Sequence, residues 1–330
     1  MASDTATFQN STRLKFIRLP AMTKPTGGGT TQVDLPRAGI LSQIYLQISV
    51  TTAGTLTTTS GWGIAAAIRR VRLTLNSGVD IVNITGAGYV YGLREMINLG
   101  LDPTPQNQGR VAPVTGTTYI LDMIIPVSIN NRDEAGLLLL QNDSTLATLV
   151  VEWETDSNVI LTGGGTYTGT CTPLLGMFEV PVAKTAWPNF SIVQQIIEEQ
   201  AAISGAGDYV YTWPRGNIYL GVYHTIQGST WTQARLRIQQ SIFLADFDVA
   251  THRVYFNSLV SRDTDLGTVN PIKNSNQRVF FDFLGTDGLG AYGAGRDPLD
   301  SRNVTDLTSV LTVAGAGTLS TVRRQLLTLS

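Results

Sequence analysis

The chain has 330 residues, of which 42% are hydrophobic and only 15% are charged. This length exceeds the size at which a single hydrophobic core stops growing, so we expect two domains. The formal net charge of −2 and the lack of any Lys/Arg block exclude the basic face that extensive direct binding to nucleic acid requires.

The charge deficit is itself informative, because typical domains carry about 25% charged residues. A chain that is poor in charge and rich in Thr, Gly, Ser, Asn and Gln is expected to bury much of its surface in an assembly. A secreted β-protein with a neutral polar surface is the alternative.

Cys171 is the single cysteine, which rules out an intrachain disulfide and is compatible with assembly in the cytoplasm. We expect neither a signal peptide nor a membrane-spanning helix, since no apolar run is long enough.

Residues 1–32 are predicted to form an N-terminal arm. Aromatic and aliphatic residues, among them Phe8 and Phe16, alternate there with Arg13, Lys15 and Arg18 before a Pro- and Gly-rich stretch. Two interpretations stay open. The arm docks on a neighbouring subunit or on a membrane surface, or it is a terminal strand packed on its own domain.

Residues 33–182 are predicted to form the first β-domain. Alternating apolar residues over 39–50 follow Leu35-Pro36-Arg37 and indicate a half-buried strand. An Arg-bearing strand, a hairpin at the Asn-Ser-Gly sequence and a short helix follow, and then further strands. The predicted ranges are 68–75 for the Arg-bearing strand, 76–78 for the hairpin, 89–98 for the helix, and 119–129, 137–140, 146–153 and 174–182 for the later strands. Pro126 places the strand 119–129 at a sheet edge or a bulge.

Residues 183–207 are predicted to be a helical linker. Apolar residues recur over 189–203 in a stripe that favours an amphipathic helix, and Glu198-Glu199 would lie on its polar face. Asn189 or Ser191 would cap its beginning, and glycines would end it.

Residues 208–330 are predicted to form the second β-domain. Its expected strands cover 217–226, 234–238, 242–249, 253–256, 278–283, 307–313 and 321–329. The loop 285–306 between two of them is longer than loops in compact domains usually are, which indicates a functional or mobile segment.

The two β-domains carry the same pattern, and this is the most informative feature of the sequence. Pro36-Arg37 opens a long alternating strand, and Pro214-Arg215 opens another (214 − 36 = 178 positions later). A polar turn and an Arg-bearing strand follow in each case. A period this long predicts a duplicated domain and excludes a solenoid of short repeats.

Catalytic signals are weak. His224, His252 and Cys171 carry no local signature of a nucleophilic site, and two histidines exclude a histidine-rich metal centre. Gly288-x-Gly290-x-x-Gly293 formally matches a dinucleotide fingerprint, but Gly295 and Pro298, which follow the motif, disfavour the helix that it must open. Solvated aspartates in the same loop account for its acidity better than a calcium site does. The prediction is therefore a chain that is not an enzyme and has no cofactor or metal.

Taken together, the tandem β-domains, the linker and the two Pro-Arg strands resemble the double jelly-roll major capsid proteins of the tectivirus-like, non-tailed, membrane-containing bacteriophages. The stretches that carry the resemblance are residues 35–50, 68–75, 119–154 and 278–313. The resemblance implies an all-β fold of two tandem eight-stranded jelly rolls joined by a helix-containing linker. It also implies homotrimers that form pseudo-hexameric capsomers of an icosahedral virion shell, assembled in the host cytoplasm over an internal lipid membrane.

Partners implied by the resemblance are further copies of the chain, minor capsid or vertex proteins and the lipid membrane, without sequence-specific nucleic acid. The residues predicted to contact a neighbour or a membrane are Arg13, Lys15 and Arg18 in the arm and Tyr292 and Arg296 in the long loop. Two other functions stay open: a phage spike or receptor-binding trimer, and a secreted two-domain sandwich that binds carbohydrate. For the latter, the five tryptophans would supply stacking platforms, unless most of them are core residues.

Overall fold

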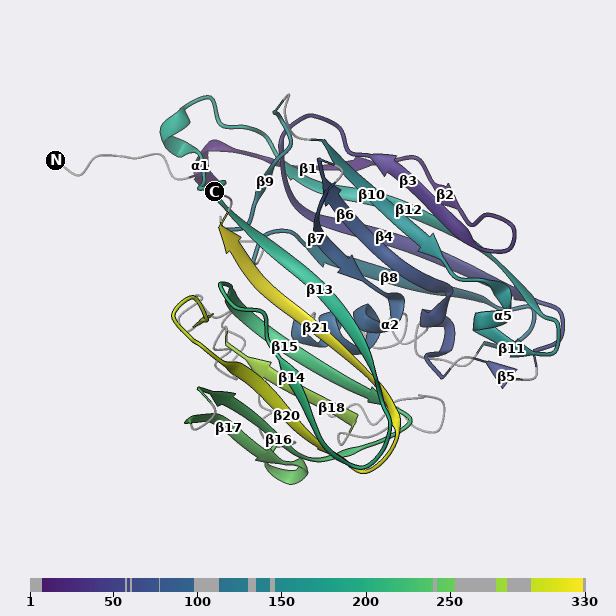
Figure 1. The fold of residues 1–330 in the computed structure, drawn as a ribbon. Helices are drawn as coiled ribbons and strands as arrows, with labels where there is room; N and C mark the ends of the chain where they lie inside the picture. The colour runs from purple at the N-terminus through teal and green to yellow at the C-terminus, as the bar shows by residue number, and fades with distance from the viewer. Residues whose placement is uncertain are drawn as a thin grey trace.

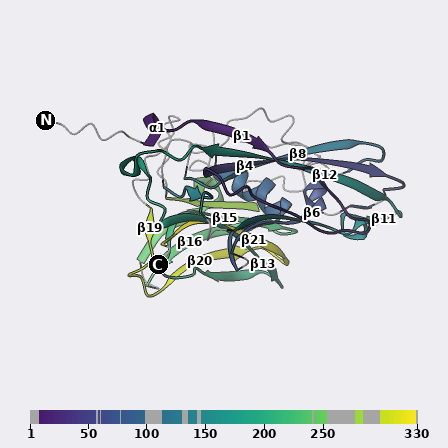
Figure 2. The ribbon, with the colours of Figure 1, turned by 90° about the horizontal axis from the view of Figure 1, so that it is seen from above.

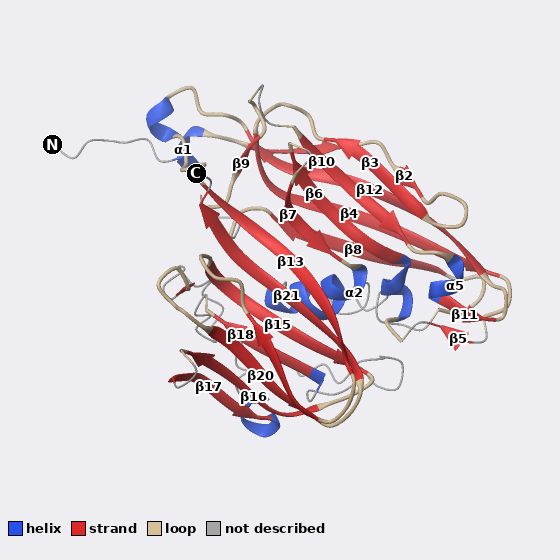
Figure 3. Ribbon diagram, viewed as in Figure 1, coloured by secondary structure: helices blue, strands red, loops and turns tan. Residues whose placement is uncertain are grey.

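The computed structural model describes residues 8–56, 58–59, 61–76, 78–97, 113–129, 135–142, 146–239, 242–252, 277–283 and 298–328. Strands dominate the described residues, and the helices are short segments between strands (Figure 3). The strands form two jelly rolls, the first at the upper right and the second at the lower left of Figure 1.

The first jelly roll has two antiparallel sheets of four principal strands each. One sheet has the order β1 (Leu14–Arg18), β12 (Thr166–Phe178), β4 (Ile40–Ala53), β8 (Thr118–Pro126), with β2 (Met22–Thr23) on β12 and β9 (Leu138–Leu139) on β4. The other has the order β3 (Gly29–Asp34), β10 (Ala147–Trp153), β6 (Ile68–Leu75), β7 (Val79–Ile84). Further short elements in this part of the chain include α1 (Phe8–Ser11), β5 (Thr58–Thr59), η1 (Gly63–Ala67), α5 (Asp156–Val159) and β11 (Ile160–Thr162).

The second jelly roll repeats this arrangement. Its first sheet has the order β13 (Ile192–Ile203), β21 (Gly317–Thr328), β15 (Ile218–Gln227), β18 (Arg278–Asp282), with β19 (Leu299–Asp300) on β15. Its second sheet has the order β14 (Gly207–Thr212), β20 (Leu307–Val313), β16 (Trp231–Ile238), β17 (Ile242–Asp248).

The sheet orders confirm the duplication. Strand by strand, β1-β12-β4-β8 matches β13-β21-β15-β18, and β3-β10-β6-β7 matches β14-β20-β16-β17. The two Pro-Arg pairs precede the equivalent strands β4 and β15, and the two Arg-bearing strands are the equivalent β6 and β16. The predicted double jelly roll is therefore correct.

The sequence explains several of the turns and strand positions. Asn76, with φ of 49°, occupies the left-handed region in the turn between β6 and β7, as its short polar side chain allows. Gly39, with φ of 69°, precedes β4 at a point where a Cβ would lie 2.7 Å from the Phe178 carbonyl oxygen. Pro126 ends β8, which is an edge strand among the described residues, as predicted.

The two jelly rolls share one continuous sheet. Ile196 and Ile197 of β13 pair in parallel with Val82 and Asn83 of β7, which joins nine strands in a single sheet. Neighbouring residues of this sheet face different cores: Tyr223 belongs to the first hydrophobic core and Val222 to the second. Consistent with this, the sheet that contains β1, β4 and β8 lies on the opposite side of the molecule from β16 and β20 (Figure 2).

The structure corrects the prediction for the first strand of the second jelly roll, and it decides between the two interpretations for the first strand of the first jelly roll. The helix predicted over 189–203 is the strand β13, and the only helix within residues 183–207 is the three-residue η4 (Lys184–Ala186). Of the two interpretations of residues 1–32, the structure favours packing on the chain's own domain for residues 8–34. These residues form β1, β2 and β3, and Phe8 is buried against Phe178 with ring centroids 5.2 Å apart.

The helix predicted over 89–98 is confirmed as a helical segment, which covers residues 86–96. It consists of α2 (Gly86–Gly88), a π-helical turn η2 (Tyr89–Leu93) and α3 (Arg94–Met96), which run on from one another directly after β7. The strand predicted over 253–256 lies outside the described residues.

Candidate assembly surfaces

The three basic residues predicted to contact a neighbour or a membrane all lie at β1. Arg13 precedes the strand, Lys15 lies within it and Arg18 ends it, and all three are exposed. Lys15 forms an ion pair with Glu179, just after β12. Among the described residues, β1 pairs with β12 on one side and has no strand on the other, so the second edge of β1 is open. Tyr292 and Arg296 lie outside the described residues.

The outward side of the sheet β1-β12-β4-β8, here called the β1–β8 face, is poor in charge. Its members are Phe16, Arg18, Tyr45, Gln47, Ser49, Ile120, Asp122, Ile124 and alternate residues of β12, namely Thr166, Thr168, Thr170, Thr172 and Leu174. Phe16 is 56% exposed and lies 6.1 Å from Tyr45 between ring centroids, and Ile120 is 37% exposed. Partial burial raises the pKa of Asp122. A face of this composition has the charge depletion that marks the centre of protein interfaces.

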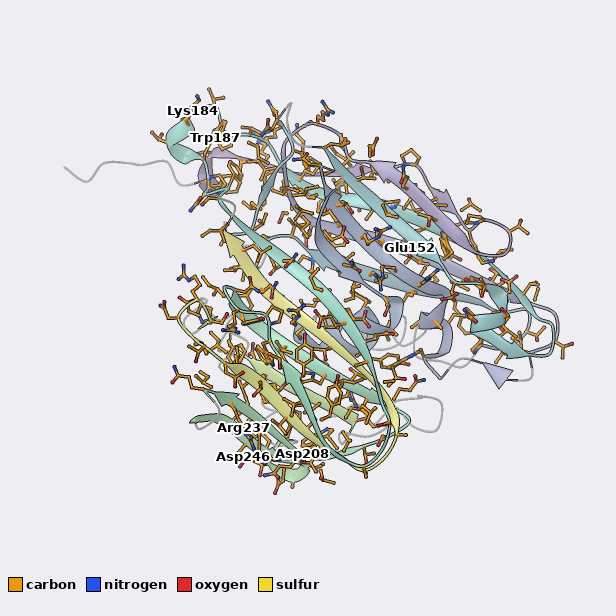
Figure 4. The ribbon with its side chains drawn as sticks, viewed as in Figure 1. Glu152, Lys184, Trp187, Asp208, Arg237 and Asp246 are labelled. Carbon is orange, nitrogen blue, oxygen red and sulfur yellow. The ribbon has the colours of Figure 1, made fainter. Side chains whose placement is uncertain are left out.

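By contrast, the outward side of the sheet β14-β20-β16-β17 is charged. Arg235 Nη2 donates to Asp208 Oδ2 at 2.9 Å, and Thr312 Oγ1 donates to Asp208 Oδ1 at 2.6 Å. The bond from Thr312, aided by the nearby Arg235 and Arg237, lowers the pKa of Asp208. Gln233 Nε2 donates to Asp246 Oδ1 at 2.8 Å. Asp208, Arg237 and Asp246 lie near one another on this sheet (Figure 4).

The outward side of β3-β10-β6-β7 is also polar, and its side chains bind one another. Arg72 and Glu152 form an ion pair at 2.7 Å, with Glu152 labelled in Figure 4. Thr148 Oγ1 donates to Asp34 Oδ1 at 2.8 Å, and Thr74 Oγ1 donates to an Asp80 carboxylate oxygen at 2.6 Å. Two of the three outward surfaces thus carry polar and charged side chains that bind one another, and the β1–β8 face is the one whose composition resembles an interface.

A fourth surface is already buried inside the chain, at the seam between the jelly rolls. The helical segment α2–η2–α3 lies against β15 and β21, where Thr225 Oγ1 donates to the Tyr91 carbonyl oxygen at 3.0 Å. Glu198 is 8% exposed and accepts bonds from Thr85 N at 2.6 Å and Ser320 Oγ at 2.7 Å. Glu198 and Glu199 point to opposite sides of β13, since Glu199 pairs with Arg323, so the two carboxylates do not form the shared polar face predicted for them.

Arg324 shows how completely this seam is desolvated. Its guanidinium donates to the Ile129 carbonyl oxygen at 3.0 Å and to Gln194 Oε1 at 2.9 Å, and burial lowers its pKa to about 10. The Asp282 carboxylate acts on the pKa of Arg324 in the opposite direction, by charge. Because the two acceptors come from different jelly rolls, the hydrogen bonds of this buried cation tie the relative positions of the jelly rolls together.

The residues considered for nucleophilic chemistry are built into cores. His224 is fully buried, with Nδ1 2.9 Å from Thr321 Oγ1 and Nε2 2.9 Å from Ser309 Oγ. His252 Nε2 accepts a bond from Phe280 N at 3.0 Å. Cys171 belongs to the first hydrophobic core, and burial raises its pKa to about 12, which disfavours the thiolate. These contacts are those of structural side chains.

The tryptophans likewise give little support to a carbohydrate site. Trp153, Trp213 and Trp231 are at most 2% exposed and belong to the cores, as the alternative interpretation of these residues predicted. Trp62 is half-buried, and Trp187 is 36% exposed. Trp187 lies with Lys184 on the segment before β13 (Figure 4).

Within the described residues, no group of three or more His, Cys, Asp and Glu side chains could hold a metal ion. The glycine motif at 288–293 lies outside them. No helix among the described residues is long and apolar enough to cross a membrane.

Sequence reasoning found the basic residues of β1 but missed the apolar and uncharged face beside them. The alternation in β4 and β12 contained the signal, because the polar members of each alternation are Thr, Ser and Gln, with no charged residue. Reading which polar residue types face outward would have singled out this sheet.

Comparison with solved structures finds the same fold in viral capsid proteins, over nearly the whole chain. The major capsid protein of Sulfolobus turreted icosahedral virus matches with a TM-score of 0.67 at 12% identity, covering 96% of this chain and 97% of that one. The major capsid protein P2 of bacteriophage PM2 matches with a TM-score of 0.55 at 12% identity, covering 96% of this chain and 98% of that one. The capsid of the virus PBCV-1 matches with a TM-score of 0.62 at 9% identity, covering 96% of this chain and 94% of that one.

No family model and no curated protein matches the chain by sequence. At these identities the similarity shows the fold, which is the double jelly roll. Because the matches include a virus of Sulfolobus as well as a bacteriophage, the fold does not single out the bacteriophage branch that the sequence resembles.

Proposed function

We propose that this chain is a viral major capsid protein. The observation that carries the proposal is the architecture: two jelly rolls fused through one continuous sheet account for the whole described chain, and one broad sheet face is left open and poor in charge. The similarity of fold to capsid proteins over 94% or more of each chain supports the same conclusion.

In the proposed assembly, three copies form a pseudo-hexameric capsomer, and capsomers tile an icosahedral shell over an internal membrane. The partners are other copies of the chain, minor capsid or vertex proteins and lipid headgroups at the inner side of the shell. The capsomer would assemble in the host cytoplasm and reside in the virion. No step in this role requires an enzyme or a cofactor.

The contact residues proposed from the sequence fit this role in chemical type. Arg13, Lys15 and Arg18 are exposed at an open strand edge, where they can meet a neighbouring subunit or anionic headgroups. For Tyr292 and Arg296 the proposal is a contact at the outer surface of the trimer or at its intersubunit seam, because these residue types are enriched among interface hot spots.

Assembly of the purified protein tests the role. We expect sedimentation to show a trimer at micromolar concentration and electron microscopy to show closed shells or capsomer sheets at higher concentration. A protein that stays monomeric across this range and binds glycans on an array would instead support the carbohydrate-binding alternative.

A further inference from the structure

Both histidines of the chain are buried in the second jelly roll. His224 belongs to β15, and His252 belongs to a helical turn at 249–252 that directly follows β17. Residues 1–191, which include the whole first jelly roll, contain no histidine. The side chains that ordinarily titrate near pH 6.5 are therefore confined to one half of the molecule.

His224 joins the two sheets of the second jelly roll through its ring nitrogens. Nδ1 lies 2.9 Å from Thr321 Oγ1 on the neighbouring strand β21, and Nε2 lies 2.9 Å from Ser309 Oγ on β20 of the opposite sheet. Trp213 Nε1 donates to the same Ser309 oxygen at 3.0 Å. A neutral imidazole has one donating and one accepting nitrogen, so the proton that charges the ring must enter a hydrogen bond in which the ring now accepts.

His252 joins the same two sheets at another edge. Its Nε2 accepts a bond from the backbone N–H of Phe280 at 3.0 Å. Because a backbone N–H only donates, Nε2 is the unprotonated nitrogen, and a proton added there would point at the amide hydrogen. Since β17 and β18 belong to different sheets, protonation of this ring removes a bond between them.

One aromatic cluster connects the two rings. Ring centroids are 6.0 Å apart between His224 and Phe281, 6.3 Å between Phe281 and Phe247, and 5.7 Å between Phe247 and His252. Phe281 and Phe247 both pack in the second hydrophobic core. Continuous packing of this kind favours opening of both histidine sites as one cooperative unit.

The groups that face His224 do not favour its charged form. From β20 and β21 the neighbours are neutral hydroxyls, and from β14 the Tyr211 ring faces the imidazole at 5.6 Å between ring centroids. The Tyr211 hydroxyl donates to Glu199 Oε2 at 2.7 Å, and Glu199 also pairs with Arg323, so this carboxylate has other partners. Burial lowers the pKa of His224 to about 3.

The surroundings of His252 act in the same direction. Burial, together with the charge of Arg278 on β18, lowers the pKa of His252 to about 4. Asp248 of β17 is bound within the turn, since its Oδ1 accepts a bond from Thr251 N at 2.7 Å. Both rings are therefore neutral in the folded protein at pH values where the unfolded chain carries them charged.

We propose that the second jelly roll is an acid-sensitive unit, in which protonation of the two histidines separates the sheet β14-β20-β16-β17 from the shared nine-stranded sheet while the first jelly roll stays closed. The inference goes beyond the proposed function and does not depend on it. Opening exposes both rings to water, so below pH 6.5 its equilibrium constant should rise about 10-fold per pH unit for each histidine. The carboxylates whose pKa is lowered lose stability only below their ordinary values of 3.8 to 4.5, so the range between pH 6.5 and 4.5 reports the histidines.

Pulsed hydrogen–deuterium exchange with peptide-resolved mass spectrometry tests the inference on the unmodified protein. The protein is held at a fixed urea concentration just below its unfolding transition at pH 7 and is labelled briefly at each pH. Between pH 6.5 and 4.5 the labelled fraction of peptides from β14, β16 and β20 should rise by about 10-fold or more per pH unit until it saturates. Peptides from β4, β8 and β12 should stay unlabelled. Labelling of both sets together, or of neither, would overturn the inference.

Substitution of the histidines tests the cause of the opening. His224→Gln and His252→Gln each keep a hydrogen-bond acceptor but bind no proton, so each should reduce the rise in labelling by about 10-fold per pH unit. Leu311→Val is the control, because Leu311 is buried in the same core and does not titrate. It should raise the labelled fraction by the same factor at every pH.

The outcomes separate this inference from the capsid role. If one glutamine variant does not fold, the other variant and the unmodified protein still give the dependence on pH. An unchanged dependence on pH in a folded glutamine variant would overturn the inference. Assembly of the unmodified chain at pH 7 tests the capsid role independently of all these results.

Discussion

Ile196 should be among the least replaceable residues of the chain, and Ile196→Asp tests this. Its side chain is 0% exposed, belongs to the first core and sits at the parallel junction of β13 with β7. The substitution removes the burial of a branched aliphatic side chain, about 1.5–3 kcal/mol. It also leaves a carboxylate in a desolvated seam, at a further cost of several kcal/mol. The sum is at least about 5 kcal/mol, comparable with the whole stability of many domains.

Expression yield and urea unfolding of the soluble fraction measure the effect. Ile196→Asp should be insoluble or should unfold at a much lower urea concentration, whereas Ile196→Val should lose only about 0.5–1.5 kcal/mol. Val114→Asp, at a 62% exposed valine, controls for the added charge and should unfold like the unmodified chain. If Ile196→Asp had the solubility and urea midpoint of the unmodified protein, β13 could not be the buried strand that joins the two jelly rolls.

Two further predictions concern the buried groups around this sheet. Burial lowers the pKa of His224 to about 3 and that of His252 to about 4, so between pH 6.5 and those values the unfolded chain binds protons that the folded chain does not. The free energy of unfolding should therefore be at its full value above pH 6.5 and should fall below pH 6.5 by about 1.4 kcal/mol per pH unit for each histidine. In His224→Gln, urea unfolding across this pH range should give a free energy of unfolding that falls less steeply with pH. An unchanged dependence on pH would contradict the lowered pKa of His224. At Gly88 a Cβ would lie 2.0 Å from Glu198 Oε2, so Gly88→Ala should lower stability by about 1–3 kcal/mol, while Gly205→Ala, with nothing within 4 Å of its Cβ, should not. Equal melting temperatures for these two alanine variants would show that the Glu198 carboxylate is free to move.

The strand β13 shows why the sequence predicted the fold and still misassigned an element. Ile192, Val193, Ile196, Ile197 and Ile203 follow a helical spacing, and the Gln, Glu and Ala residues among them favour helix. The structure buries parts of both sides of β13, one against each jelly roll, so the alternation that identifies a half-buried strand is absent. Its pairing partners, β21 and β7, are distant in the sequence, and long-range pairing overrode local propensity.

The arm is a case in which the sequence left two interpretations open. β1 is a short edge strand with mostly exposed residues, so no clear alternation separated a terminal strand packed on its own domain from an arm that docks elsewhere. Yet β1 and β13 are equivalent strands, each the first of its jelly roll. Extending the duplication backward from Pro36 and Pro214 would have aligned them and identified both as strands. What the sequence could not supply was the β7–β13 pairing, because a two-residue parallel contact leaves no periodic signal.

The mass of the unmodified protein in solution tests the central claim most directly. Native mass spectrometry or analytical ultracentrifugation at micromolar concentration should give three times the chain mass of 35.6 kDa, about 107 kDa, with larger species at higher concentration. A single species of 35.6 kDa throughout this range would contradict the proposal that this chain is a capsid protein that assembles from copies of itself.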